Sequence, residues 1–181
     1  IVLCMVLAGL IFSLAGCAEE AGQPEAGVQQ ENSAVSEEEF AGDGAWTILV
    51  YLCGTDLESG YGAATMDLGE MLDRDFGSQV RFVVQTGGCT QWQNEVIPED
   101  AIARYEIING DMQEISRMEQ ANMAESATLK DFVTFGMENY GNNKLGLIMW
   151  DHGGGSVAGV CLDENYGTDT LDLAEIQQAL D

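Results

Sequence analysis

Three long runs of apolar and β-branched residues lie along the chain, at residues 46–52, 80–86 and 145–150. Apolar side chains occupy nearly every position of these runs rather than every second one. Such continuity is typical of parallel strands that are covered on both faces. A shorter run at residues 103–108 alternates more between apolar and polar side chains, which predicts a strand at a sheet edge or in a hairpin.

Helical spacing of apolar residues fills the intervals between these runs. It predicts one helix over residues 64–72 and a second over residues 129–140. A third helix is expected from Asp172, whose carboxylate lies three residues before Glu175 and suits a capping box. The alternation of strands and helices predicts an α/β protein with a layered αβα fold and a mainly parallel central sheet. Because the last helix reaches Asp181 without a stop signal, we expect the domain to be truncated at its C-terminus.

The beginning of the chain has a different pattern, an uncharged apolar run within residues 1–17. The run is shorter than the roughly 20 apolar residues of a membrane-spanning helix, and it fits the apolar core of a secretory signal. It ends at Leu14-Ala15-Gly16-Cys17, which resembles a bacterial lipoprotein signal in which the cysteine carries the lipid. A plain signal peptide and a short buried helix are the alternatives. Neither a Met start nor a basic residue precedes the run, so we expect this leader to be incomplete at its front.

Residues 18–45 are rich in acids, contain no basic residue and carry few large apolar side chains. Such a segment cannot bury enough surface to offset the entropy of ordering it. It is predicted to be a disordered acidic linker between the membrane and a folded domain at residues 46–181. An acidic recognition tail is the alternative interpretation.

Charge narrows the possible partners of this protein. The chain has 31 acidic and 6 basic residues, and its formal net charge is −25. A charge this negative repels phosphate backbones, which argues for no nucleic acid among its partners. The hydrophobic fraction of 46% argues against wholesale disorder, so a folded domain is expected.

A turn that contains glycine follows each long apolar run, where open parallel sheets bind their ligands. These turns are residues 53–56, 87–89 and 151–155, and the last contains His152, the one histidine of the chain. An imidazole titrates near neutrality and can act as a general base. The glycines after it allow a backbone N–H to donate to an oxyanion. On spacing alone, a structural role for this turn is the alternative.

Three of the five cysteines, Cys53, Cys89 and Cys161, belong to the predicted domain. Exported domains can form disulfides, so a bond between Cys53 and Cys89 is one candidate, and burial of Cys53 as a small apolar side chain is another. Cys161 is near His152 in the sequence and is therefore a candidate nucleophile. A single histidine argues against a His-rich zinc site, and the sequence has no phosphate-binding loop or dinucleotide fingerprint.

Several segments, in this order, resemble the clostripain-like cysteine peptidases, a family with the caspase-type fold. They are WTILVYLCGTDLES at 46–59, DLGEM at 67–71, GGCTQW at 87–92, LKDFVTF at 129–135 and LIMWDHGGG at 147–155. The resemblance continues through residues 160–164 and the predicted last helix. It covers the chain from about residue 46 to the end.

The resemblance implies that the protein is a cysteine endopeptidase with a Cys–His dyad. His152 is then the catalytic histidine, and the Gly153 amide contributes to the oxyanion hole. In this family the nucleophilic cysteine follows the next core strand, in an Asp-Ala-Cys type motif, and none of Cys53, Cys89 and Cys161 matches it. We therefore reject Cys161 as the nucleophile and expect this chain to carry the histidine, to lack the thiol and to be inactive alone.

Further implications of the resemblance concern partners and metals. The expected substrate is a protein or peptide, with a basic residue before the scissile bond as in clostripain. Calcium is a candidate cofactor because some relatives depend on it, and Asp56, Glu58, Asp163 and Glu164 are candidate ligands. Solvated loop acids and helix caps are the favoured alternative, so no metal ligand is assigned.

The leader and the domain together predict a lipid-anchored peptidase on the extracytoplasmic face of a bacterial cell envelope. Its membrane contact is the lipid on Cys17. The alternative is a non-catalytic, lipid-anchored surface lipoprotein that binds a partner and keeps the peptidase-like fold.

Overall fold

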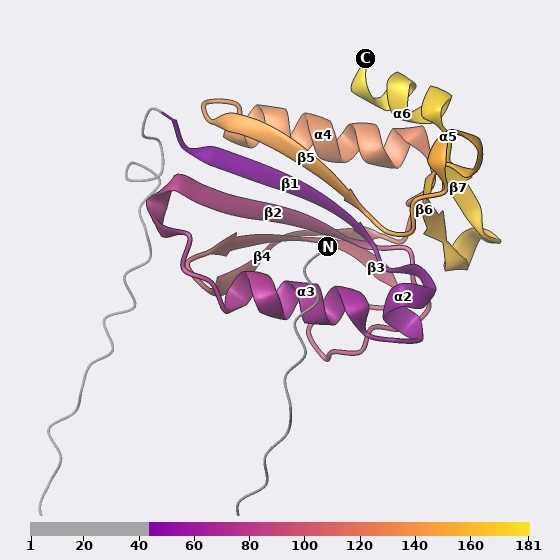
Figure 1. Cartoon of the computed structure of the whole chain (residues 1–181), viewed down its shortest axis with the longest axis horizontal. Coiled ribbons are helices and arrows are strands. Elements are labelled where there is room, and N and C mark those ends of the chain that lie inside the picture. The colour runs from indigo at the N-terminus through magenta and orange to yellow at the C-terminus, as the bar shows by residue number, and fades with distance from the viewer. Residues whose placement is uncertain (1–43) are drawn as a thin grey trace, which may run out of the picture. The chain divides into compact units, whose positions relative to one another are not determined.

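A computed structural model describes residues 44–181 (Figure 1). The predictions for the lipoprotein-type signal, and for the acidic linker apart from Gly44 and Ala45, lie outside the described residues. Ala45 is buried, and its carbonyl accepts a hydrogen bond of 3.0 Å from the Lys144 amide. The domain therefore includes Ala45. Within the described residues, no helix is long and apolar enough to cross a membrane.

The first strand, β1 (Trp46–Cys53), lies inside a five-stranded sheet with the order β4-β3-β2-β1-β5. It pairs in parallel with β2 (Val80–Gly87) on one side and with β5 (Lys144–Trp150) on the other. The three apolar runs thus form the parallel part of the sheet, as predicted. β1 and β2 are buried on both faces over most of their length.

An antiparallel hairpin extends the sheet beyond β2. Its strands are β3 (Ala101–Ile108) and β4 (Asp111–Glu119), and β3 pairs antiparallel with β2 as well. The hairpin expected for residues 103–108 is confirmed, although β3 is an inner strand and β4 forms the edge. Asn109 and Gly110 make the turn with φ of 49° and 81°, the two positive values of the turn that suits a two-residue hairpin loop.

Helices cover the two faces of the sheet and give the predicted αβα layers (Figure 1). α3 (Ala63–Leu72) packs on one face, where Val50 and Leu52 of β1 join its Ala64 and Leu68 in a core cluster. On the other face, α4 (Ser126–Tyr140) and α6 (Leu173–Leu180) pack against a second cluster that includes Leu49 and Tyr51. The chain therefore buries apolar side chains on both faces of its sheet.

Two local features fix the helices on the Leu49 face. Gly136 of α4 packs against the Leu49 side chain, and a Cβ at this position would clash with Leu49 Cδ1. Glycine therefore lets the helix approach the sheet closely here. Asp172 accepts hydrogen bonds from the amides of Ala174 and Glu175, and the Glu175 carboxylate accepts one from the Asp172 amide. The predicted capping box at the start of α6 is thus confirmed.

The expectation that β5 is covered on both faces is wrong in part. Its side chains are half-buried or exposed, and Ile148 is 45% exposed. Among the described strands β5 pairs only with β1, so it forms the outer strand of the sheet on that side. Its apolar side chains are consequently less covered than those of β1.

Short elements complete the domain. α2 (Thr55–Ser59) follows β1, and α5 (Gly155–Ala158) follows β5. A small antiparallel pair, β6 (Val160–Asp163) and β7 (Asp169–Leu171), precedes α6. Two single 3-10 turns are also present: η1 (Gly77–Gln79) precedes β2, and η2 (Glu164–Tyr166) lies between β6 and β7.

Candidate active site

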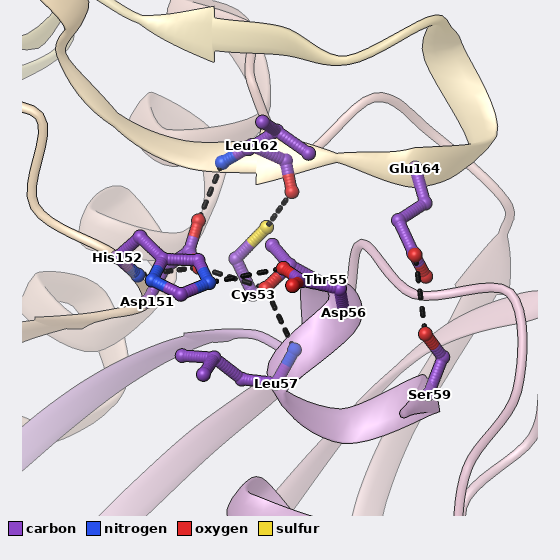
Figure 2. Close-up of polar contacts among 9 residues, drawn as sticks. All are labelled: Cys53, Thr55, Asp56, Leu57, Ser59, Asp151, His152, Leu162 and Glu164. Atoms are coloured by element: carbon purple, nitrogen blue, oxygen red, sulfur yellow. Dashed lines mark hydrogen bonds and ion pairs between the residues drawn. The ribbon is translucent and has the colours of Figure 1, made fainter. Parts of the chain in front are cut away.

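The carboxyl ends of the parallel strands meet at one edge of the sheet. β1 ends at Cys53 and turns into α2, while β5 ends at Trp150 and continues into Asp151 and His152. β6 contacts the ends of both strands and α2. This edge is where open α/β sheets bind ligands, and the turns that the sequence singled out come together here (Figure 2).

The imidazole of His152 is exposed and points toward Asp56 of α2 (Figure 2). Its Nε2 lies 3.0 Å from Asp56 Oδ1, and 53% of the histidine side chain and 61% of the aspartate side chain are exposed. From the sequence, Asp56 was a candidate calcium ligand or a solvated loop acid, and no contact with His152 was expected. The two residues are far apart in the chain, and the adjacency of β1 and β5 brings them together.

The carboxylate of Asp151 joins three segments of the site. It accepts hydrogen bonds from the Thr55 hydroxyl at 2.9 Å, from the Leu162 amide at 2.6 Å and from the His152 amide. Burial raises the pKa of this carboxyl above its ordinary value, and the three hydrogen bonds act in the opposite direction. Asp151 thus connects the start of α2 and the strand β6 to the histidine turn, a role that could not be seen in the sequence.

Thr55 has a strained backbone at the point where β1 becomes α2. Its φ is 47°, in the left-handed region that β-branched residues rarely adopt. Its side chain is fully buried, and its hydroxyl is held by Asp151. This sharp turn directs the next residue, Asp56, toward the histidine.

The glycines after His152 differ in their surroundings. Gly153 forms an isolated antiparallel bridge with Val160, and nothing lies within 4 Å of the position that a Cβ would occupy there. Gly154 is crowded, because a Cβ would lie 2.6 Å from Ala158 Cβ, and its amide donates to the Gly159 carbonyl at 2.8 Å. Gly153 therefore offers an open surface beside His152 for close approach of another molecule.

Two of the acids considered for calcium are buried structural acceptors. Glu58 is 0% exposed and accepts hydrogen bonds from the amides of Thr65 at 2.8 Å and Gln93 at 2.7 Å. Asp163 is 0% exposed and accepts from the Met123 amide at 2.8 Å. Neither acid is solvated, so that part of the alternative is wrong. The helix-cap part holds for Asp163, which accepts a hydrogen bond from the Asn165 amide at the start of η2.

Glu164 connects the loops after β1 and β2. Its carboxylate accepts hydrogen bonds from the Ser59 hydroxyl at 3.1 Å and from the Thr90 amide at 3.0 Å. Glu164, Glu58, Asp163 and Asp56 each have different partners. Within residues 44–181, no group of three or more histidine, cysteine, aspartate or glutamate side chains is arranged to hold a metal ion.

The three cysteines of the domain are free and buried. Cys53 is 0% exposed, which confirms its expected burial, and its thiol donates to the Leu162 carbonyl at 3.3 Å. It belongs to the cluster under α4 and Cys89 to the cluster under α3, and no disulfide joins them, contrary to the pairing considered. Burial raises the pKa of the Cys53 thiol well above its ordinary value and that of Cys89 to about 12.

Cys161 is also unsuited to act as the partner of His152. It is 0% exposed, and it packs in the same cluster as Cys53. In the described part of the chain, no hydrogen bond joins any of the three thiols to the histidine ring, whose partner is Asp56. This geometry agrees with the rejection of Cys161 as the nucleophile.

Fold and site together define an αβα domain of the caspase type, with its histidine turn after the outer parallel strand. The chain belongs to the clostripain family, whose model matches residues 50–181. The resemblance found in the sequence is therefore confirmed. No match was found among curated protein sequences.

One solved structure shows a similar fold, and a second matches less of this chain. The structure of a secreted cysteine protease from Bacteroides thetaiotaomicron, in complex with an irreversible peptide inhibitor, is 19% identical with a TM-score of 0.55. The match covers 76% of this chain and 39% of that protein, so the chain spans about two fifths of its length. A cysteine protease of B. fragilis is 20% identical with a TM-score of 0.47, and the match covers 62% of this chain and 92% of that one.

Proposed function

We propose that this chain is the histidine-bearing part of a cysteine endopeptidase that cleaves peptide bonds through a Cys–His dyad. The observation that carries the proposal is an exposed histidine beyond the carboxyl end of a parallel strand, in a chain of the clostripain family. His152 is the catalytic histidine. We place the nucleophilic cysteine outside these 181 residues, because each thiol of the domain is buried and none is hydrogen-bonded to the imidazole within residues 44–181.

The reaction is acyl transfer. The cysteine loses its proton to His152, and the thiolate attacks the peptide carbonyl carbon and forms a thioester as the C–N bond breaks. His152 gives the proton to the leaving amine. A water molecule, deprotonated by His152, then attacks the thioester carbonyl and releases the carboxylic acid and the thiol.

The backbone amide of Gly153 also takes part in the reaction. Its amide donates a hydrogen bond to the negative oxygen that develops during each attack. The open space around Gly153 supports this role, because a substrate carbonyl must come within hydrogen-bond distance of the backbone. The favoured substrates carry a basic residue before the scissile bond, and the negative charge of the chain supports the attraction of such peptides.

The leader sequence supports a location outside the cytoplasm. Cys17 carries a lipid that anchors the protein to the extracytoplasmic face of the cell envelope, and residues 18–45 connect the anchor to the peptidase domain. The sequence Leu14-Ala15-Gly16-Cys17 after an uncharged apolar run supports this assignment.

The test uses the full-length protein and fluorogenic peptides that end in Arg, Lys or a neutral residue. We expect hydrolysis of the basic peptides, labelling of one cysteine by a thiol-directed peptide electrophile, and loss of at least about a thousandfold in kcat for His152→Ala. Val157→Ala is the matched control, because Val157 is in the next helix and 92% exposed. It is expected to keep wild-type activity.

Two outcomes would contradict the proposal. Near-wild-type activity of the folded His152→Ala protein would show that this histidine has no catalytic role. A wild-type protein that neither cleaves any peptide nor reacts with the electrophile would instead support the non-catalytic lipoprotein.

A further inference from the structure

The contact between Asp56 and His152 is the feature of this site that the dyad does not use. Asp56 Oδ1 lies 3.0 Å from Nε2 of the imidazole, and both side chains point into the same open edge of the sheet (Figure 2). An exposed ion pair of this kind contributes little to stability, typically about 0–1 kcal/mol. The need for a stable fold therefore does not explain why these two groups meet.

We propose that Asp56 is a positioning residue that holds the imidazole of His152 in the orientation and tautomer needed for catalysis. This inference rests on the proposed peptidase function and adds a third member to its dyad. Asp56 acts through His152 and forms no bond with the substrate.

The chemistry of the two groups determines which ring nitrogen is left for the reaction. A carboxylate can only accept hydrogen bonds, so Nε2 carries the hydrogen that it donates to Asp56. In the neutral imidazole Nδ1 is then the unprotonated nitrogen. It takes the proton of the cysteine thiol and later returns that proton to the leaving amine, while the Nε2 hydrogen stays with Asp56. Between these steps the carboxylate stabilises the imidazolium.

The backbone around the contact supports a positioning role. Asp56 follows Thr55, whose φ of 47° is a strained value for a β-branched residue. Such strain costs about 1–3 kcal/mol and persists only where the surroundings hold it. The hydrogen bond from the Thr55 hydroxyl to Asp151 provides that hold, and Asp151 directly precedes His152. The Asp151 side chain thus fixes both backbone segments, the one that carries Asp56 and the one that carries His152.

The experiment compares Asp56→Ala with Asp73→Ala in the full-length protein. Asp73 is an exposed acid at the end of α3. Its replacement by alanine changes the net charge of the protein by the same amount as Asp56→Ala does. We expect Asp56→Ala to lower kcat by about 10- to 100-fold with KM changed less than about threefold. The equivalent loss is near 10⁴ for the buried aspartate of a serine protease, and this aspartate is more exposed. The loss should be equal for basic and neutral peptides.

Nitrogen NMR of histidine-labelled protein provides a readout that a structural role would not change. The signals missing from His152→Ala identify those of His152. In the wild type they should show a protonated Nε2 and an unprotonated Nδ1 above the pH at which the ring loses its charge. Asp56→Ala should give a mixture of the two tautomers, and Asp73→Ala should match the wild type.

Three results would overturn the inference. The first is wild-type kcat in Asp56→Ala, and the second is a wild-type His152 spectrum in that variant. The third is a KM that rises for basic peptides alone, which would make Asp56 a group that binds the substrate cation. If His152→Ala is inactive while Asp56→Ala is fully active, only the role of Asp56 fails. If His152→Ala is itself active, the proposed function fails.

Discussion

Replacing Asp151 by asparagine tests whether one carboxylate holds the strand ends together around the histidine. The two oxygens of Asp151 accept hydrogen bonds from the Thr55 hydroxyl and from the amides of His152 and Leu162. An asparagine side chain has one acceptor oxygen and one donor nitrogen. Whichever way it is turned, its NH₂ group faces the amide N–H of either His152 or Leu162, and that backbone donor is left without an acceptor.

The magnitude of the effect follows from these contacts. An unpaired buried donor costs about 1–3 kcal/mol, and each hydrogen bond that loses its charged acceptor weakens by roughly 1 kcal/mol. Removal of a partly buried charge offsets some of this loss, since burial raises the pKa of Asp151. We expect a net decrease of about 2 kcal/mol in the free energy of unfolding, which lowers Tm by roughly 6–10 °C.

The loss should also depend on pH. Because the folded-state pKa of Asp151 is raised, the folded protein binds a proton here more tightly than the unfolded chain does. This contribution to stability is fully present below the unfolded-state pKa and is lost as the pH rises through the folded-state pKa. Asparagine does not titrate, so the variant should lose more stability relative to wild type at about pH 5 than at about pH 7.

Urea unfolding followed by circular dichroism at both pH values measures these differences. Asp67→Asn is the matched control, because Asp67 is a half-buried carboxylate with one donor, Trp150 Nε1 at 2.6 Å. An asparagine oxygen can accept that single bond, so the control should lose less than about 1 kcal/mol. An Asp151→Asn variant with the same free energy of unfolding as the wild type would refute this reasoning. So would a variant whose loss of stability is larger at about pH 7 than at about pH 5.

Two further predictions concern the turn after the histidine and the thiols. Gly153→Ala should fold with a nearly unchanged Tm but lose about tenfold or more in kcat/KM, because its methyl group enters open space beside the reacting carbonyl. Gly154→Ala should lower Tm, because a Cβ there would clash with Ala158. Equal Tm values for Gly153→Ala and Gly154→Ala would contradict these expectations. Cys53 and Cys89 should resist alkylation in the native protein and react after unfolding, as peptide mass spectrometry would show, since only thiolates react readily.

The centre of the fold could be predicted because its apolar pattern is strong. The three continuous apolar runs are the three parallel strands, and the spacing at Asp172 and Glu175 gives the start of α6. β4 was missed because most of its side chains are exposed, which leaves no alternation to detect. The dipeptide Asn109-Gly110 was a signal that could have revealed the hairpin, because it favours the turn that the structure contains.

The candidate site could be predicted only where one segment supplies the chemistry. His152 and Gly153 are neighbours in a single turn, so the resemblance of that turn was enough to select them. Asp56 and Asp151 depend on contacts between segments about a hundred residues apart. Likewise, the buried Glu58 accepts a hydrogen bond from the amide of Gln93, which comes from a separate segment 35 residues along the chain. Such pairings follow from the strand order, which local sequence patterns do not specify.

β1, an inner strand of the sheet, is also the first of the described strands to be synthesised. Trp46 at the start of β1 pairs with Val80 of β2, but its other neighbour, Lys144 of β5, comes about a hundred residues later. Pairings this distant in sequence slow folding, and until β5 arrives one edge of an apolar strand lacks its partner. A nascent chain would therefore be prone to aggregate during this interval. Substitutions along the β1–β5 pairing should therefore lower the yield of folded protein as well as its final stability, because β1 lies in the core.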